Sequence, residues 1–218
     1  MNKLFEELSI KPNDLSYYER ALTHTSFANE KQVEHYERLE FLGDSVIQLI
    51  VSEYLFEHDP SDEGILTKRR AQCVREEALN LYAETINLTS YINLGKGEAE
   101  KGANASIIAD VFEAIMAAIY LDLGYQTAKE VFTKILIPLL EEVKELKDYK
   151  SQLQEFVAVD RKTLKYECDS KGPSNKREFT ARVYLEGTIL LGSGFGYSKK
   201  EAEQQAAKVA LSKLAKGT

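Results

Sequence analysis

The sequence predicts two domains: an all-helical domain over residues 1–146, followed by an α+β domain of order α-β-β-β-α over residues 147–218. Apolar residues recur at spacings of three and four through the first region, as on the buried faces of helices. After about Asp148 they alternate with period two, which is typical of strands. The charge balance changes at the same point: 14 Lys and Arg stand against 9 Asp and Glu from Lys147 onward, but 14 against 26 before it. Such asymmetry indicates two domains with separate tasks.

Polar residues and glycines mark where the helices of the first domain begin and end. Asp14 is expected to cap the helix that follows it, and Asp62 with Gly64 to form the turn before another. A charged, glycine-punctuated loop is expected over Gly95–Gly102. The stretches with helical spacing are Leu39–Phe56, Ile65–Ile86, Ile107–Leu123 and Ala128–Val143.

The second domain combines two helices with three strands. Glu186-Gly187 is expected to form a hairpin turn, and the glycines of the third strand to loosen it. The junction Glu141–Lys150 is either a short hinge or a continuation of helix. The expected elements are a helix over Tyr149–Val157, alternating strands around Leu164–Cys168 and Phe179–Leu185, a third strand over Ile189–Phe195, and a helix after Ser198.

Composition excludes several classes of protein. No apolar run approaches the ~20 residues of a membrane span, and the N-terminus carries acids where a secretory signal has an apolar core. Cys73 and Cys168 lie too far apart in the sequence to indicate a disulfide framework. We therefore expect a cytoplasmic protein without a membrane partner. The net charge of −7 argues against a nucleic-acid partner, but the basic second domain reverses that conclusion.

Two groups of carboxylates occupy helical segments whose other residues are mostly apolar. Glu37, Glu40 and Asp44 stand at i, i+3 and i+7, along one face of a helix. Asp110 and Glu113 interrupt an otherwise apolar run, and a helix that is hydrophobic nearly all round is buried. Burying unpaired carboxylates costs several kcal/mol, roughly, for each group, so they must be protonated, paired with cations or bound to metal.

The residue types narrow the metal interpretation. Oxygen ligands without thiolates favour a hard cation such as Mg²⁺. None of His24, His35 and His58 follows an inward glutamate by three residues, which disfavours a di-iron bundle. His24 is interpreted as a structural hydrogen-bonding residue. Ordinary ion pairs, for example with Arg38, Arg69 or Arg70, remain the alternative to metal binding.

Three segments resemble motifs of the ribonuclease III family. Glu37–Ser45 reads ERLEFLGDS and is similar to the family signature at all nine positions. Ala109–Ala114 resembles the family's second acidic motif, and Ala21–Phe27 its N-terminal motif. The resemblance covers essentially the whole chain. It implies an all-α ribonuclease III catalytic domain over residues 1–146 and a double-stranded-RNA-binding domain over residues 147–218.

The resemblance also implies roles for individual residues. Asp44 and Glu113 correspond to catalytic acids, Glu37 and Glu63 to auxiliary acids, and Phe41 to a residue that inserts into the partner subunit of a homodimer. The metal-binding acids that the family pattern implies are Glu40, Asp44, Asp110 and Glu113.

The activity implied is endonucleolytic cleavage of double-stranded RNA with Mg²⁺, for which Mn²⁺ substitutes, and with no organic cofactor. The expected products carry 5′-phosphate and 3′-hydroxyl ends with two-nucleotide 3′ overhangs, and the expected substrates are rRNA precursors and mRNA. The family often has Arg or Lys before the second motif, where this chain has Gly102–Ser106. Lys96 or Lys101 is expected to substitute for that residue in contacting a phosphate. A protein that binds duplex RNA without cutting it is the alternative function.

Residues 148–217 resemble a double-stranded-RNA-binding domain. Asp148–Glu155 matches its first helix, Gly172-Pro173 opens its first loop and Ser198–Gln204 begins its last helix. Such domains recognise the shape of duplex RNA over ~16 base pairs. Asn175 stands where the family usually has His. The RNA contacts implied by the resemblance are Gln154, Glu155, Asn175, Lys176, Lys199 and Lys200.

Lys199 and Lys200 point to an anion without the resemblance. Ser198 and Glu201 have the spacing of a capping box, which marks the start of a helix. Cations in the first helical turn are disfavoured by roughly 0.3–1 kcal/mol each. Two lysines at that place are explained if a phosphate group docks there; otherwise they are simply solvated.

Overall fold

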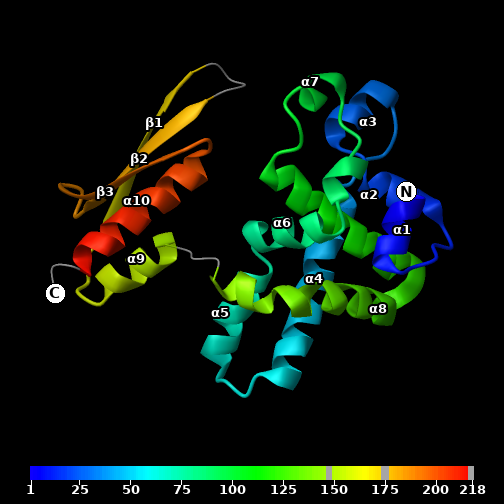
Figure 1. Ribbon diagram of the computed structural model, residues 1–218, viewed down its shortest axis with the longest axis horizontal. Coiled ribbons are helices and arrows are strands. Elements are labelled where there is room, and N and C mark those ends of the chain that lie inside the picture. Colours follow the sequence, from blue (N-terminus) through cyan, green and yellow to red (C-terminus); the bar gives the residue numbers. More distant parts are fainter. Residues whose placement is uncertain (146–148, 173–176, 216–218) are drawn as a thin grey trace. The chain divides into compact units, whose positions relative to one another are not determined.

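A computed structural model describes residues 1–145, 149–172 and 177–215 of the chain. The chain divides into two units, Met1–Leu146 and Lys147–Thr218 (Figure 1). Among the described residues, none of the helices combines the length and the apolarity that crossing a membrane requires.

The first unit is helical, as the spacing of its apolar residues predicts. The Asp14 carboxylate accepts a hydrogen bond from the Ser16 amide at 2.9 Å and caps α2, as expected. The helices are α1 (Asn2–Leu8), α2 (Leu15–Ala21), α3 (Thr25–Lys31), α4 (Glu37–His58), α5 (Glu63–Cys73), α6 (Glu76–Thr85), the 3₁₀ turn η1 (Leu88–Tyr91), α7 (Lys96–Ala99) and α8 (Ala105–Glu145).

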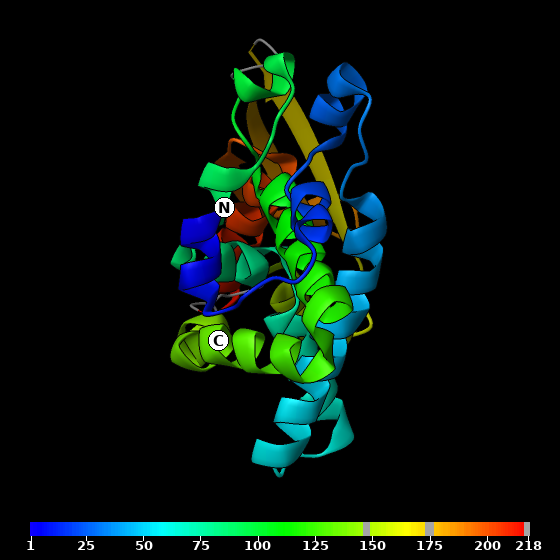
Figure 2. The same cartoon turned by 90° about the vertical axis from the view of Figure 1, so that its right-hand side faces the viewer.

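Helices α4 and α8 pack against each other in this unit, and the ribbon shows the last part of α8 lying across α4 (Figures 1 and 2). Between Val111 and Ile119 every residue of α8 except Glu113 is fully buried. At Gly124 the backbone leaves helical geometry (φ 84°, ψ 170°), so α8 consists of two helices joined at a kink. This kink separates the two helical stretches that the sequence predicts there.

The helical stretch expected over Ile65–Ile86 is two helices. Helix α5 ends at Cys73, and α6 begins at Glu76 after an extended Arg75 (φ −75°, ψ 157°). Tyr82 of α6 donates a hydrogen bond of 3.1 Å to the Cys73 carbonyl. No Gly or Pro stands at the break between the two helices. This tertiary contact and the burial of α6 determine where the chain turns.

The second unit has the predicted order, and its helices cover one face of an antiparallel sheet ordered β1-β2-β3 (Figure 1). Glu186 and Gly187 both adopt positive φ, 52° and 71°, in the hairpin turn between the last two strands. The question of hinge or helix at the junction falls on residues 146–148, outside the described residues. The elements are α9 (Tyr149–Ala158), β1 (Leu164–Lys171), β2 (Glu178–Leu185), β3 (Ile189–Gly196) and α10 (Lys199–Leu214).

The glycines of β3 have a packing role that their effect on strand propensity does not predict. Side chains at Gly192, Gly194 and Gly196 would collide with the backbone of α10 around Ala202, Ala206 and Ala210. Those three alanines are fully buried. Glycines facing alanines therefore let α10 approach the sheet closely.

Candidate active site

The candidate site lies where α4 crosses α8. Gly43 of α4 faces the backbone of Glu113 in α8, and any side chain at position 43 would collide with the Glu113 carbonyl group. Gly43 stands between Glu40 and Asp44 in the sequence. Its lack of a side chain therefore brings the acids of α4 next to those of α8.

The carboxylates of these two helices perturb one another. Burial, followed by the charges of Asp44, Glu40 and Asp110, raises the pKa of Glu113 to about 8. Burial also raises the pKa of Glu40, and the charges of Asp110, Glu37 and Asp44 add to the shift. The same cause raises the pKa of Asp110. These shifts mark a half-buried cluster of like charges, which is the environment that binding a cation would relieve.

Neutral donors, rather than cations, hold two of the four acids. Tyr36, the residue before α4, donates its hydroxyl hydrogen to Asp110 Oδ2 at 3.2 Å. Burial and the charge of Asp110 raise the pKa of Tyr36, which keeps it protonated as a donor. The Gln48 amide nitrogen lies 2.9 Å from both oxygens of Asp44. These contacts orient the carboxylates without neutralising them.

Among the described residues, no Lys or Arg forms an ion pair with Glu40, Asp44, Asp110 or Glu113. This is evidence against the ordinary ion pairs that the sequence left open. In the same described part of the chain, no three His, Cys, Asp or Glu side chains are grouped so that they could hold a metal ion. The four candidate ligands are all carboxylates, and carboxylate oxygens are suited by their chemistry to a hard cation. Joint binding would require the side chains to turn toward a common point.

The auxiliary acids differ in their relation to the cluster. Glu37 is exposed and adds to the negative potential at Glu40 and Asp110. Glu63 is exposed in the first turn of α5, where it accepts a hydrogen bond from Thr67 at 3.1 Å, and it is not among the charges that shift the pKa of Glu40, Asp110 or Glu113. Glu76 of α6, which the sequence did not indicate, raises the pKa of Asp110. Acids are common in the first turn of a helix, so the position of Glu76 in the sequence does not indicate this role.

Phe41 lies on the outside of this chain. It follows Glu40 in α4, yet 81% of its surface is exposed, so it is not an ordinary core residue. Leu49 and Phe56 are exposed on the same helix, at 55% and 81%. The spacings of 8 and 15 residues place all three on one side of α4.

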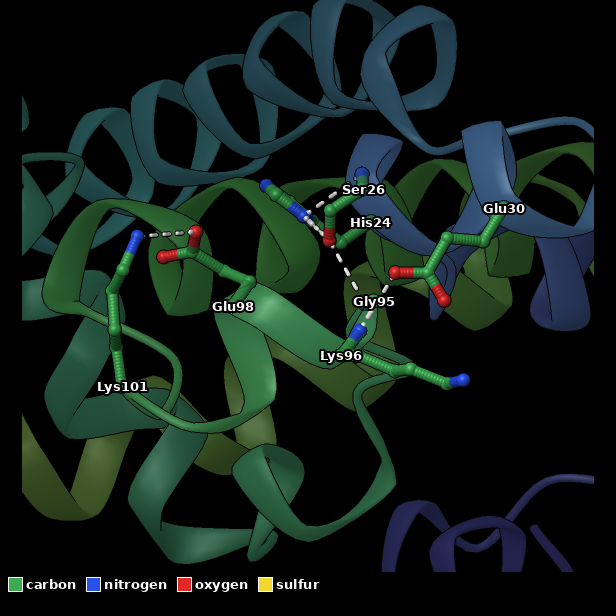
Figure 3. Close-up of polar contacts among 7 residues, drawn as sticks. All are labelled: His24, Ser26, Glu30, Gly95, Lys96, Glu98 and Lys101. Atoms are coloured by element: carbon green, nitrogen blue, oxygen red, sulfur yellow. Dashed lines mark hydrogen bonds and ion pairs between the residues drawn. The ribbon is translucent and has the colours of Figure 1, made fainter.

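His24, at the start of α3, links this helix to the acid cluster, and Figure 3 shows its contact with Ser26. The His24 ring caps α3: its Nδ1 lies 2.7 Å from Ser26 Oγ and accepts from the Ser26 amide at 3.2 Å. The ring lies 5.8 Å from that of Tyr36, and His24 acts electrostatically on Asp110. The interpretation of His24 as a structural hydrogen-bonding residue agrees with these contacts.

The second unit presents part of its expected RNA contacts at the surface. In α9 the buried Leu153 and Val157 face the core, whereas Gln154 and Glu155 are exposed. Gly172, with φ 95°, begins the loop after β1. The remaining expected contacts of that loop, Asn175 and Lys176, lie outside the described residues.

The start of α10 is built as a capping box with one modification. The Ser198 hydroxyl accepts from the Glu201 amide at 3.1 Å, while the Glu201 carboxylate accepts from the Tyr197 amide at 2.7 Å rather than from that of Ser198. Lys199 and Lys200 are exposed in the first turn. Lys199 Nζ lies 4.0 Å from Glu203, whose other oxygen is 2.5 Å from Lys150. An internal partner therefore explains part of the placement of Lys199.

Comparisons with known proteins agree with this arrangement. Residues 14–140 match the family model described as Ribonuclease-III-like, and residues 149–214 match the double-stranded RNA binding motif. A helical nuclease domain followed by a duplex-RNA-binding domain defines an endoribonuclease that acts on double-stranded RNA.

Relatives over the full length specify the family. The chain is 51% identical over 217 residues to Ribonuclease 3 of Onion yellows phytoplasma, with 98% of this chain and 91% of the relative covered. It is 42% identical to Ribonuclease 3 of Streptococcus pyogenes serotype M3, covering 98% and 99%. The nuclease domain of ribonuclease III from Campylobacter jejuni superposes with a TM-score of 0.58 at 38% identity, covering 62% of this chain and 94% of that one. The chain belongs to the ribonuclease III family.

Proposed function

We propose that the chain cleaves double-stranded RNA by metal-dependent hydrolysis, with Glu40, Asp44, Asp110 and Glu113 holding Mg²⁺. The observation that carries this proposal is the half-buried cluster of carboxylates, in which burial and neighbouring negative charges raise the pKa of Glu40, Asp110 and Glu113. In the described part of the chain, none of the four acids forms an ion pair with a Lys or Arg. A bound Mg²⁺ ion would lower the pKa of a water molecule and align it with the scissile phosphate. Mn²⁺, with similar ligand preferences, should substitute.

The residues of the chain prepare this site in two ways. Tyr36 and Gln48 orient Asp110 and Asp44 while leaving their charge available. Glu113, with a pKa of about 8, holds a proton at neutral pH and would release it as a cation approaches. We assign Asp44 and Glu113 as catalytic acids, because they stand in the two acidic motifs that resemble those of the family, and the Asp44 charge contributes to the raised pKa of Glu113. Glu37 and Glu63 are assigned auxiliary roles.

We further propose a homodimer in which Phe41 contacts the partner subunit. An exposed Phe beside a metal-binding acid, with further exposed apolar residues along the same side of α4, supports this interface. The related nuclease domain from Campylobacter jejuni has a region that is involved in dimer formation and is structurally flexible. Two sites acting on opposite strands would give 5′-phosphate and 3′-hydroxyl ends with two-nucleotide 3′ overhangs.

The basic domain is proposed to hold the duplex through Gln154, Glu155, Asn175, Lys176, Lys199 and Lys200. Recognition by shape suits structured transcripts, so the proposed substrates are rRNA precursors and mRNA in the cytoplasm.

The central experiment incubates the full chain with a long RNA duplex in EDTA, Mg²⁺, Mn²⁺ or Ca²⁺ and analyses the product ends. Cutting is expected with Mg²⁺ and Mn²⁺ only, because Ca²⁺ has longer bonds and looser geometry. Binding without cutting under every condition would favour the alternative of a non-cleaving RNA-binding protein. Efficient cutting in EDTA would contradict the metal-dependent mechanism.

The dimer is tested by sedimentation of Phe41→Ala. This variant is expected to dissociate at concentrations where the wild-type chain is dimeric, since it removes a large apolar contact. Phe156→Ala, which removes a 50% exposed Phe of the other domain, serves as the control. A wild-type chain that sediments as a monomer would contradict the proposed dimer.

A further inference from the structure

Two side chains of α3 hold the backbone of the segment that leads into α7. Ser26 Oγ accepts from the Gly95 amide at 2.9 Å, and Glu30 Oε1 accepts from the Lys96 amide at 2.8 Å (Figure 3). A parallel bridge between Thr23 and Asn93 precedes these contacts. Consecutive amides are thus fixed to one helix. We call this arrangement, formed by Ser26, Glu30, Gly95 and Lys96, the α3–α7 clasp.

The backbone amide of Lys96 and its ammonium group have different surroundings in the clasp. The Glu30 carboxylate contacts the Lys96 amide, whereas the Lys96 ammonium group extends away from it (Figure 3). Lys96 is exposed, and no acid of the described residues forms an ion pair with it. Lys101, at the other end of the segment, has its ammonium group 3.3 Å from Glu98. Of these two lysines, Lys96 is the one whose charge is available.

The clasp is connected to the acid cluster by direct contacts. Ser26 Oγ, which receives the Gly95 amide, lies 2.7 Å from the His24 ring. His24 neighbours Tyr36, which donates to Asp110. The path of contacts from the clasp to Asp110 therefore runs through Ser26, His24 and Tyr36, and the inference places the RNA backbone along this path. The first domain carries a large excess of acids, so an available cation beside the cluster would offset part of the repulsion of phosphate.

We propose that Ser26 and Glu30 are positioning residues for RNA binding, which fix the backbone at Gly95 and Lys96 so that the Lys96 ammonium group meets an RNA phosphate beside the acid cluster. The inference deepens the proposed function and rests on it for the location of the RNA. The proposal differs from simple electrostatics in the direction in which replacing Glu30 changes the affinity for RNA. Removing an acid from an acidic domain should by simple electrostatics strengthen RNA binding, whereas loss of a positioning acid should weaken it.

The test measures duplex RNA affinity and its salt dependence with the full chain in Ca²⁺, and KM and kcat in Mg²⁺. Lys96→Ala is expected to weaken binding and raise KM roughly three- to tenfold, with a salt slope shallower by about one and kcat nearly unchanged. Lys101→Ala, in the same segment but with its charge paired, is the matched control and should leave both constants within about twofold of wild type.

Three variants of the clasp then separate positioning from charge. Glu30→Ala should weaken binding, while Glu30→Gln, which keeps an oxygen acceptor for the Lys96 amide and removes a negative charge, should bind at least as tightly as the wild-type chain. Ser26→Ala should resemble Glu30→Ala. Glu19→Ala, which removes another exposed acid of the domain, should bind equally well or more tightly. The double variant with Lys96→Ala and Glu30→Ala should bind no more weakly than Lys96→Ala alone, because Glu30 acts through Lys96.

Several results would overturn the inference: binding by Glu30→Ala that equals or exceeds that of wild type, an equal loss in Glu30→Gln, or additive losses in the double variant. A Lys96→Ala variant with unchanged salt slope would do the same. If the wild-type chain binds duplex RNA but does not cut it, the proposed function fails, yet the affinity comparison still decides the role of the clasp.

Discussion

The carboxylates of the helical domain and the lysines of the α+β domain carry their charges in different surroundings. Glu113 is flanked by fully buried residues, and burial moves its pKa to about 8. Lys199 and Lys165 are exposed and lie near acids of their own domain, Glu203 and Glu167. The proposed hydrolysis would therefore depend on close internal packing, whereas the proposed RNA contacts would depend on many exposed charges of small individual weight.

This difference predicts unequal responses to substitution. Changes in the acid cluster should act nearly all-or-none on cleavage and also alter the stability of the fold. Changes at the proposed phosphate-binding lysines of the basic domain should act in graded, salt-dependent steps on affinity alone.

The largest effect is expected for Glu113→Gln. The substitution removes a proposed metal-ligand charge at nearly constant shape, so cleavage should fall on the order of a hundredfold or more, the scale of losing one preorganised electrostatic contact. RNA affinity should remain, because the basic domain is untouched. Cleavage rates and duplex binding are measured side by side. The control is Glu53→Gln, which alters an α4 carboxylate held by Tyr125 and Lys129. If Glu113→Gln cleaved RNA as fast as Glu53→Gln, Glu113 would not be a metal ligand.

The next effect concerns packing between the two central helices. Gly43→Ala places a methyl group against the Glu113 carbonyl, so the helices must separate. The free energy of unfolding should fall by about 1–3 kcal/mol or more, and cleavage should fall with it. Urea unfolding measures the first. Gly64→Ala is the matched control, since a side chain there meets nothing within 4 Å. Equal stability of the two variants would show that α4 and α8 are not in close contact at Gly43.

The sequence predicted those features of this site that depend on local order. Helix α4, the buried run in α8 and the Asp14 cap follow from spacing and residue type. The contacts that tune the site do not, because they join residues distant in the chain: Tyr36 meets Asp110 across 74 positions, and Glu76 acts on Asp110 from another helix. Helical periodicity cannot identify such pairs.

The same limit applied to the glycines and to the break between α5 and α6. Gly43 resembles any helical glycine until its neighbour in α8 is known, and the β3 glycines suggest a weakened strand until α10 is placed against them. The chain turns at Val74 and Arg75 without a turn residue, since the burial of Tyr82 and Leu79 determines the break. Tertiary packing decided each of these features.

A third, smaller effect is the pH dependence of stability without divalent ions. The folded-state pKa of Glu113, about 8, exceeds its ordinary value of 4.5, so the folded chain binds more protons between these values. The free energy of unfolding should therefore fall as pH rises from about 4.5 to 8. Glu40 and Asp110 add shifts of the same sign. The measurement is the urea midpoint of unfolding at pH 5 and at pH 8 in EDTA. The difference between these two midpoints should be smaller in Glu113→Gln than in the wild-type chain. An equal difference in both would contradict the raised pKa of Glu113.

The smallest effect is expected at the start of α10, where Lys199→Ala is combined with Lys200→Ala. Two lost phosphate contacts should make the slope of log affinity against log salt shallower by up to about two, with little regard to RNA sequence. Stability should hardly change: relief of an unfavourable dipole interaction offsets loss of the surface pair between Lys199 and Glu203, and Lys150 still contacts Glu203. Cleavage at saturating RNA should persist, because the acids of the other domain are unaltered.

The matched control for this pair removes the same charge from the same helix. Lys208→Ala with Lys213→Ala takes two lysines from the later part of α10: Lys213 stands in the last turn, where the helix dipole favours a cation, and the Lys208 ammonium group lies over the Tyr149 ring. If the first-turn lysines bind phosphate, only their removal should change the salt slope, whereas the control should lose stability instead. A lower melting temperature with an unchanged slope in Lys199→Ala, Lys200→Ala would mean that these lysines are structural. Equal slopes in both double variants would mean that net charge, rather than a docked phosphate, determines affinity at this end of the domain.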